Sequence, residues 1–147
     1  MELSDSFRVM APSSRVWEFF WDFPLLASCL PGCDRIEAID QSSFSAYVKQ
    51  RIGPFSLEME LVFTIQEVTP NRSVILVGGD RRGMIVKVNR ASLDVASISA
   101  EESRVSYNAD VHLLGKLGIL GYSIVNRRAK QVGVEFSRRL AEALETP

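Results

Sequence analysis

The sequence has 147 residues, of which 46% are hydrophobic and 24% charged, so it can bury the core of one domain and is too apolar for intrinsic disorder. Its 17 Lys and Arg side chains nearly balance 18 Asp and Glu, which excludes a general attraction to nucleic acid. It shows no apolar leader and no run of roughly 18 apolar residues, so we expect one cytoplasmic domain over residues 1–147.

The amino-terminal part predicts one strand followed by two short helices. The strand covers residues 2–10. Apolar residues then recur at helical spacing from Val16 to Phe23, and Pro24 ends this helix. A second helix is predicted from Leu25 to Leu30, which ends at Pro31.

The middle of the chain, residues 34–114, predicts about six antiparallel strands. In "FSLEMELVFTIQEV" and "RVSYNADVHLL" apolar and polar residues alternate, which is typical of strands buried on one face only. Gly, Pro and Asn residues mark the corners between the strands. This part therefore forms an antiparallel sheet together with the first strand.

After Gly121 the apolar period becomes 3.6, which predicts one terminal helix of about 24 residues. Seven strands span roughly 30 Å, whereas a helix is only about 10 to 12 Å across. We therefore expect an α+β fold in which a curved seven-stranded antiparallel sheet wraps the long helix and the two short helices close one end. Such a fold can enclose an apolar cavity, although inner Phe, Leu and Met side chains can also fill that space.

Several local motifs carry a resemblance to a known family. "FRVMAPSSRVWEFFWD", "SCLPGCDRIEAI", "RIGPF", "RASLDV" and "LLGKLGILG" follow one another from about residue 7 to 144. With the order of elements, they resemble the CoxG family of carbon monoxide dehydrogenase subunits, within the START-like and birch-pollen-allergen-like (SRPBCC) helix-grip superfamily. "CLPG" and "GKLGxLG" are the more diagnostic pieces.

The resemblance implies a non-catalytic accessory protein that binds a hydrophobic, quinone- or lipid-like molecule and serves a molybdenum hydroxylase such as carbon monoxide dehydrogenase. Family members are thought to act in membrane recruitment or quinone delivery. The sequence ends at Pro147 without a carboxyl-terminal tail, so we expect at most peripheral contact with the inner membrane face. The alternative is a polyketide cyclase or dehydratase of the same superfamily, which would need acid-base groups in the cavity.

The candidate ligand-binding residues are the side chains expected to face inward from the sheet and from the terminal helix. They are Met59, Leu61, Phe63, Leu93, Val95, Tyr107 and Val111 from the sheet, and Val125, Val132 and Phe136 from the helix. Tyr107 alone in this set carries a hydroxyl, which suits a ligand carbonyl. No catalytic residue and no cofactor are expected.

The other motifs favour ordinary structural roles. Cys29 and Cys33 flank a Pro-Gly corner at a spacing that is not the common redox one, and zinc would need more ligands than His112 can add. His112 is expected to project away from the core. Arg81 and Arg82 in "GGDRRG" belong to a solvated loop, with contact to a ligand headgroup as the alternative.

The segment "LLGKLGILGYSIV" precedes the terminal helix and is apolar and glycine-rich. It is a candidate gate or membrane contact through Leu117, Ile119 and Leu120, near the basic side chain of Lys116. The alternative is that these apolar residues pack beneath the start of the helix.

Overall fold

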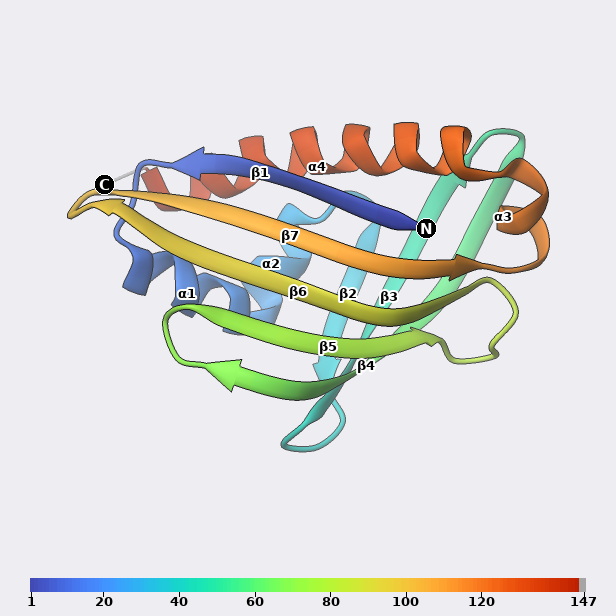
Figure 1. The fold of residues 1–147 in the computed structure, drawn as a ribbon, viewed down its shortest axis with the longest axis horizontal. Helices are drawn as coiled ribbons and strands as arrows, with labels where there is room; N and C mark the ends of the chain where they lie inside the picture. The colour runs from blue at the N-terminus through green and yellow to red at the C-terminus, as the bar shows by residue number, and fades with distance from the viewer. Residues whose placement is uncertain (146–147) are drawn as a thin grey trace.

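The computed structural model describes residues 1–145 and has the α+β architecture expected from the sequence (Figure 1). In chain order its elements are β1 (Glu2–Val9), α1 (Ser13–Trp21), α2 (Phe23–Cys29), β2 (Cys33–Ala38), β3 (Ser43–Ile52), β4 (Phe55–Thr69), β5 (Ser73–Asp80), β6 (Val86–Ser99), β7 (Glu102–Leu113), α3 (Gly115–Leu120) and α4 (Tyr122–Glu145).

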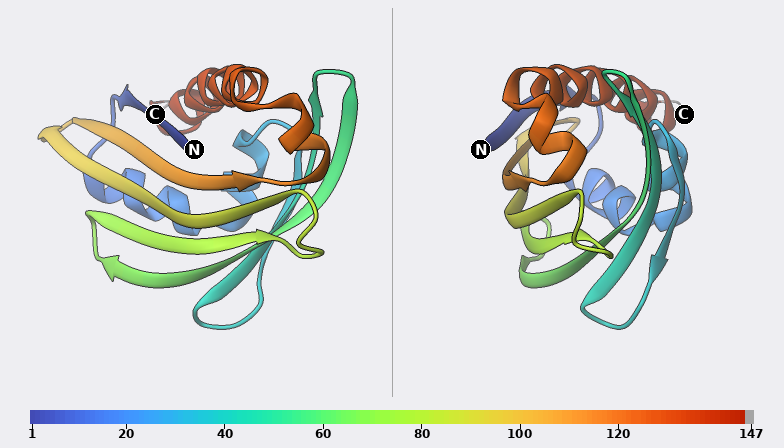
Figure 2. Two further views of the ribbon diagram at one scale, coloured as in Figure 1. Left: turned by 45° about the vertical axis from the view of Figure 1, so that its right-hand side comes forward. Right: turned by 90° about the vertical axis from the view of Figure 1, so that its right-hand side faces the viewer.

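All seven strands form one antiparallel sheet in the order β1-β7-β6-β5-β4-β3-β2. The sheet curls into a half-barrel, and α4 lies along its open side between β1 and the β3–β4 hairpin (Figure 2). This is the helix-grip arrangement. No helix within residues 1–145 is long and apolar enough to cross a membrane.

The end of the half-barrel covered by α1 and α2 is tightly packed. Val9, Val16, Phe19, Val105 and Leu140 are each at most 2% exposed there. In the same core the Phe136 ring of α4 contacts three other phenylalanine rings, with centroids 6.1 to 6.2 Å from its own. These are Phe7 of β1 and Phe19 and Phe20 of α1. Because such close packing supplies most of the burial energy of a small domain, this end is the main stabilising core.

The Pro31-Gly32 corner between α2 and β2 is held by a side-chain hydrogen bond from β3. The Gln50 side-chain amide donates a hydrogen bond of 2.6 Å to the Pro31 carbonyl, and the Arg128 guanidinium of α4 donates to the Gln50 amide oxygen at 3.0 Å. Gly32 has a φ of 77°, and a Cβ there would lie 2.2 Å from the Lys49 carbonyl oxygen. The diagnostic "CLPG" motif therefore ties α2 and β2 to β3 and α4.

The helix boundaries differ from the prediction near Pro24. The first helix ends at Trp21, and the Asp22 carboxylate accepts a 3.3 Å hydrogen bond from the Leu25 N–H, which caps α2. Pro24 stands in the first turn of α2, where a missing N–H costs no helical hydrogen bond. The proline therefore begins the second helix rather than ending the first.

Candidate functional site

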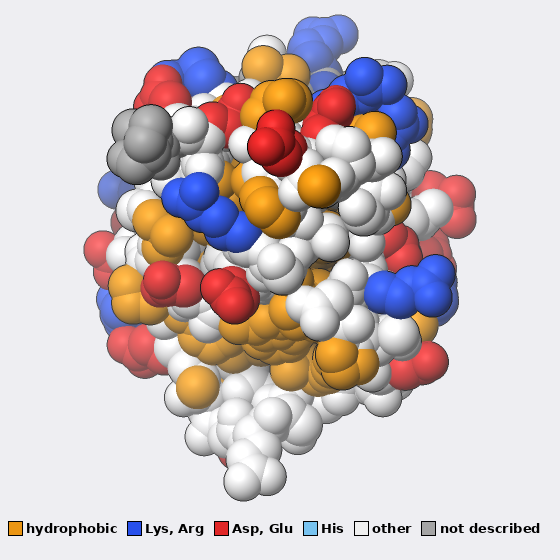
Figure 3. Space-filling view, turned by 90° about the vertical axis from the view of Figure 1, so that its left-hand side faces the viewer, with side chains coloured by type: hydrophobic (Ala, Val, Ile, Leu, Met, Phe, Trp, Pro, Cys, Tyr) orange, Lys and Arg blue, Asp and Glu red, His pale blue; other side chains and the backbone are white. Residues whose placement is uncertain are grey.

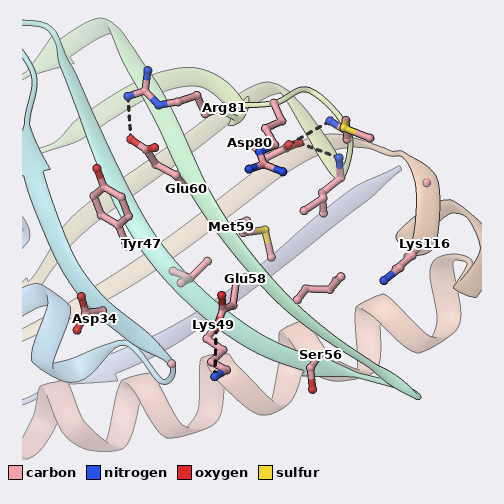
Figure 4. Close-up of a pocket in the computed structure, with 17 residues that line it drawn as sticks. Asp34, Tyr47, Lys49, Ser56, Glu58, Met59, Glu60, Asp80, Arg81 and Lys116 are labelled. Atoms are coloured by element: carbon pink, nitrogen blue, oxygen red, sulfur yellow. Dashed lines mark hydrogen bonds and ion pairs between the residues drawn. The ribbon is translucent and has the colours of Figure 1, made fainter.

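A hollow with a volume of about 900 Å³ lies beside the first half of β4 (Figure 4). The pairing of β4 with β5 begins only at Leu61, opposite Asp80, so residues 55–60 pair with β3 alone. Their other edge faces the β5–β6 loop, residues 81–85, and the start of α3. We call this space the β4 hollow; the residues lining it are Gly32, Asp34, Tyr47, Val48, Lys49, Ser56, Leu57, Glu58, Met59, Glu60, Asp80, Arg81, Arg82, Met84, Ile85, Gly115 and Lys116.

The lining of the β4 hollow has an apolar part on the concave side of the sheet. Val48 pairs with Met59, so both side chains project to the side that holds the core. Leu57 belongs to a buried cluster with Leu117 and Val125, against which Met59 packs. The hollow therefore continues from the surface to the apolar face beneath α4.

The polar part of the lining lies on the convex face and is internally paired. The Lys49 ammonium lies 3.2 Å from the Glu58 carboxylate, and the Arg81 guanidinium donates to Glu60 at 2.7 Å. This hydrogen bond from Arg81 lowers the pKa of Glu60. The Arg81–Glu60 pair links the β5–β6 loop to β4, and the Lys49–Glu58 pair links β3 to β4. Both pairs include an exposed cation, so they contribute little stability.

The Asp80 side chain holds the β5–β6 loop through hydrogen bonds to its backbone. Its buried carboxylate, 8% exposed, accepts hydrogen bonds from the backbone N–H groups of Met84, Ile85 and Val86 at 3.0, 2.9 and 2.8 Å. Burial alone would raise the pKa of Asp80, but these three donors outweigh it and the pKa is lowered. An ionised Asp80 therefore holds Met84, whose side chain is 66% exposed, at the border of the hollow.

The candidate ligand-binding residues divide into two groups. Met59 lines the β4 hollow, while the other half-buried members, Leu61, Phe63, Leu93, Tyr107 and Val132, lie elsewhere on the sheet and on α4. Val95, Val111, Val125 and Phe136 are buried. Val95 and Phe136 belong to the buried core cluster under α1, and neither lines the β4 hollow.

The middle of the inner sheet face is less tightly packed than its ends. Phe63 stands opposite Gly78 on β5, and Leu76 stands opposite Ala91 on β6. These four residues are only half-buried, and two of them are small. Figure 3 shows hydrophobic side chains gathered on the face of the molecule that carries α1 and the β4–β5 turn. Apolar surface is therefore accessible there as well as at the β4 hollow.

Tyr107 lies under α4. A Cβ added at Gly133 of α4 would stand 3.6 Å from the Tyr107 hydroxyl oxygen, an ordinary van der Waals distance, so the phenol lies against this turn of the helix. Partial burial, with the nearby negative charge of Asp5, raises the pKa of Tyr107. The phenol is therefore neutral at pH 7 and carries an O–H that can donate a hydrogen bond.

The three candidate gate residues have different environments. Leu117 is 4% exposed and belongs to the buried cluster that contains Leu57 and Val125. Leu120 packs against this cluster, whereas Ile119 is 79% exposed. The segment forms the short helix α3, so residues three apart share its inner side and Ile119 projects outward. Leu117 is part of a buried cluster with Val125 of α4, which agrees with the alternative that these apolar residues pack beneath the start of the helix.

The sequence prediction missed much of the β4 hollow, including Val48, Leu57, Ile85 and Lys116. A usable signal was the length of the strands. β4 has 15 residues and β5 only 8, so one half of β4 must extend beyond its neighbour and leave an edge unpaired. The alternating stretch "FSLEMELVFTIQEV" beside the short "SVILVGGD" contains this information.

The thiols and the histidine lie outside the hollow. Cys29 is buried and Cys33 half-buried, both as free thiols, and burial raises the pKa of Cys33. His112 is exposed on β7 opposite Lys87, as predicted. Among residues 1–145 no three His, Cys, Asp or Glu side chains gather in a way that could hold a metal ion.

Several solved structures share this fold at low sequence identity. A conserved protein from Geobacillus kaustophilus has a TM-score of 0.87 at 18% identity, over 99% of this chain and 95% of its own. A START superfamily protein from Mycobacterium smegmatis has a TM-score of 0.77 at 12% identity, over 98% and 97%. The Zhui aromatase/cyclase from Streptomyces sp. R1128 has a TM-score of 0.61 at 15% identity, over 98% and 90%.

No curated protein matches the sequence. Residues 6–145, in contrast, match the family model for CoxG, a carbon monoxide dehydrogenase subunit, and this match covers nearly the whole chain. The START-like fold and the corner and loop motifs agree with this match. The chain therefore belongs to the CoxG family of carbon monoxide dehydrogenase subunits.

Proposed function

We propose that the protein binds a hydrophobic small molecule, quinone- or lipid-like, through the β4 hollow and the adjoining inner face of the sheet. The hollow supports this proposal most directly, since its volume of about 900 Å³ falls within the range of roughly 300–1,000 Å³ typical of ligand sites. Its apolar part continues to half-buried side chains beneath α4. Family membership points in the same direction.

The proposed role is that of a non-catalytic accessory protein. In the β4 hollow, Glu58 and Glu60 are engaged by cations and Asp80 by backbone N–H groups, so these carboxylates are poorly placed to transfer protons. The alternative, a cyclase-like enzyme, would need a free acid-base group against its substrate. The family name suggests a carbon monoxide dehydrogenase or related molybdenum hydroxylase as the partner, to which the protein would deliver an electron acceptor or which it would recruit.

The test is to purify the protein from its source and identify bound molecules by native mass spectrometry and organic extraction. We expect a co-purifying isoprenoid or lipid. Equilibrium dialysis with a short-chain quinone then locates the site. Met59→Trp should fill the hollow and weaken binding about tenfold or more, because the apolar contact is lost to a side chain that occupies the same space. Val134→Trp, on the 69% exposed outer side of α4, is the matched control.

Equal loss of binding in both variants, or no binding of any apolar probe by the wild type, would contradict the proposal. Circular dichroism of both variants shows whether the fold is kept. A preparation that turns over a polyketide-like substrate would favour the cyclase alternative.

A peripheral membrane contact is proposed at the α3 end. Ile119 and Met84 are exposed hydrophobic side chains near the cationic Lys116, a composition suited to the membrane interface. Ile119→Ser should reduce co-sedimentation with vesicles that contain anionic lipid, whereas Ile39→Ser, an exposed residue beyond the end of β2, should leave it unchanged. Equal sedimentation of wild type and Ile119→Ser would remove this contact.

A further inference from the structure

Two cations lie at the border of the β4 hollow without a carboxylate partner. Lys116 and Arg82 are exposed and line the hollow, and within residues 1–145 neither forms an ion pair. Figure 4 shows the Lys116 side chain extending from α3 toward the space beside β4. Both cations are therefore available to a ligand.

The acidic side chains around the same space are already engaged. Glu58 is paired with Lys49 and Glu60 with Arg81, while Asp80 accepts three backbone N–H groups. Asp34 lies 2.6 Å from Arg35. Asp34, Glu58 and Glu60 each have a cationic partner, and the buried Asp80 carboxylate is solvated by backbone N–H groups that leave its charge in place. Among the exposed charges at the border, Lys116 and Arg82 are the ones without an ion-pair partner within residues 1–145. This favours an anion at that position.

The positive border stands directly beside apolar surface. The Lys116 ammonium lies 5.2 Å from the centre of the Phe55 ring, and Phe55 packs against the buried cluster that includes Leu57. Met59 and Ile85 face the same space. A molecule with an anionic head and an apolar tail matches this arrangement, with its head at the border that carries the two cations and its tail along β4.

We propose that the β4 hollow selects an amphiphile with an anionic headgroup, a carboxylate or a phosphate, which Lys116 and Arg82 bind. This inference rests on the proposed function, because it assigns the headgroup chemistry of the ligand whose apolar part that function describes. A neutral ligand of the same tail length would gain only the apolar contacts.

The test compares matched ligands in vesicle-free solution by isothermal titration, below their critical micelle concentrations. Dodecanoate and dodecyl phosphate carry the two anionic heads, and dodecanol is the neutral ligand with the same tail. We expect at least one anionic ligand to bind about three- to tenfold more tightly than dodecanol, the range that two exposed ion pairs supply. The preference should be lost in the Lys116→Met, Arg82→Met double variant and should shrink in 0.5 M NaCl for the wild type.

Lys87→Met provides the control, since Lys87 is an exposed cation of β6 outside the β4 hollow. Preference for the anionic ligands should persist in this variant. The inference is overturned if all three ligands bind the wild type equally, or if Lys87→Met removes the preference as fully as the double variant does. Failure of the proposed function gives a different result, in which dodecanol and both anionic ligands fail to bind.

Discussion

The two ends of the interface between sheet and helix are built differently. Under α1 and α2, Phe19 and Leu140 are at most 2% exposed and three aromatic rings surround Phe136. Beside α3, residues 55–60 of β4 have no strand partner on one edge, exposed Met84 lines the hollow, and exposed Ile119 projects from α3. The core under α1 and α2 is closely packed, whereas the end beside α3 holds the β4 hollow.

This difference separates stability from binding within one small domain. Close-packed side chains stabilise the filled end, so the open end can leave apolar surface accessible without unfolding the molecule. The loop beside the hollow is held by polar contacts, Asp80 to its backbone and Arg81 to Glu60, rather than by a core. Substitutions at the two ends should therefore have different consequences.

The largest contrast is expected between Leu140→Ala and Met59→Ala. Leu140 is fully buried, so its truncation should lower the free energy of unfolding by about 3–4 kcal/mol, whereas truncation of half-buried Met59 beside an existing hollow should lower it by about 1 kcal/mol. Urea unfolding measures both. Equal losses of unfolding free energy would mean that the two ends contribute equally to stability.

A second contrast compares two glycines with positive φ. Gly32→Ala in the Pro31-Gly32 corner should cost about 3 kcal/mol, because the methyl group meets the Lys49 carbonyl at 2.2 Å in addition to the unfavourable backbone angle. Gly83→Ala, in the β5–β6 loop, has a φ of 68° and nothing within 4 Å of the new atom, so about 1 kcal/mol is expected. A thermal unfolding series that ranks them in reverse would refute the steric argument.

The sequence predicted the order of elements well because the periods are clear: two along the strands and 3.6 from Tyr122 onward. It did not predict which inner residues face empty space. Val95 and Met59 alternate in the same way, yet one lies in the filled core and the other beside the hollow. Burial depends on what covers a strand, and alternation only identifies a face.

Local irregularities also escaped the pattern. The pairing of β6 with β7 shifts register between Val88 and Arg90, so the strand carries a bulge that the alternation cannot reveal. Likewise, the apolar connection before α4 forms α3, and this helical turn is what places Leu117 inside and Ile119 outside. The bulge in β6 and the helical turn α3 therefore determine which of the predicted contact residues are exposed to a ligand or a membrane.

A smaller loss of stability is expected when Asp80 is substituted, and this loss depends on pH. At pH 7 Asp80→Asn should lower stability by about 1–2 kcal/mol, because the neutral amide accepts the loop N–H groups less strongly than the carboxylate does. The folded-state pKa of Asp80 is below its ordinary value of 3.8, so its contribution is complete above that value and is lost as the pH falls through the folded pKa.

Urea unfolding of wild type and Asp80→Asn at several pH values checks this sign. The difference between them should be constant near neutrality and should narrow in acid, where the wild-type carboxylate takes up its proton. A difference that persists unchanged down to the lowest pH at which the protein folds would show that the ionised carboxylate does not hold the loop. The protection of the Met84 and Ile85 amides against hydrogen exchange should also fall in acid, because both N–H groups donate to the Asp80 carboxylate.

The smallest change in stability is expected on the solvent side of α4, which lies outside both the packed core and the β4 hollow. Hydrogen bonds from Arg138 and Arg139 lower the pKa of Glu135 to about 2. The Glu135 side chain is 36% exposed and lies at the surface, so Glu135→Gln should leave the unfolding midpoint at pH 7 nearly unchanged even though the pKa is strongly perturbed. NMR titration of the carboxyl carbon should report the low pKa, and Arg138→Met should raise it while Lys87→Met should not. If Glu135→Gln destabilised the protein as much as Asp80→Asn, solvent-exposed charge pairs would matter here as much as the buried carboxylate that holds the loop.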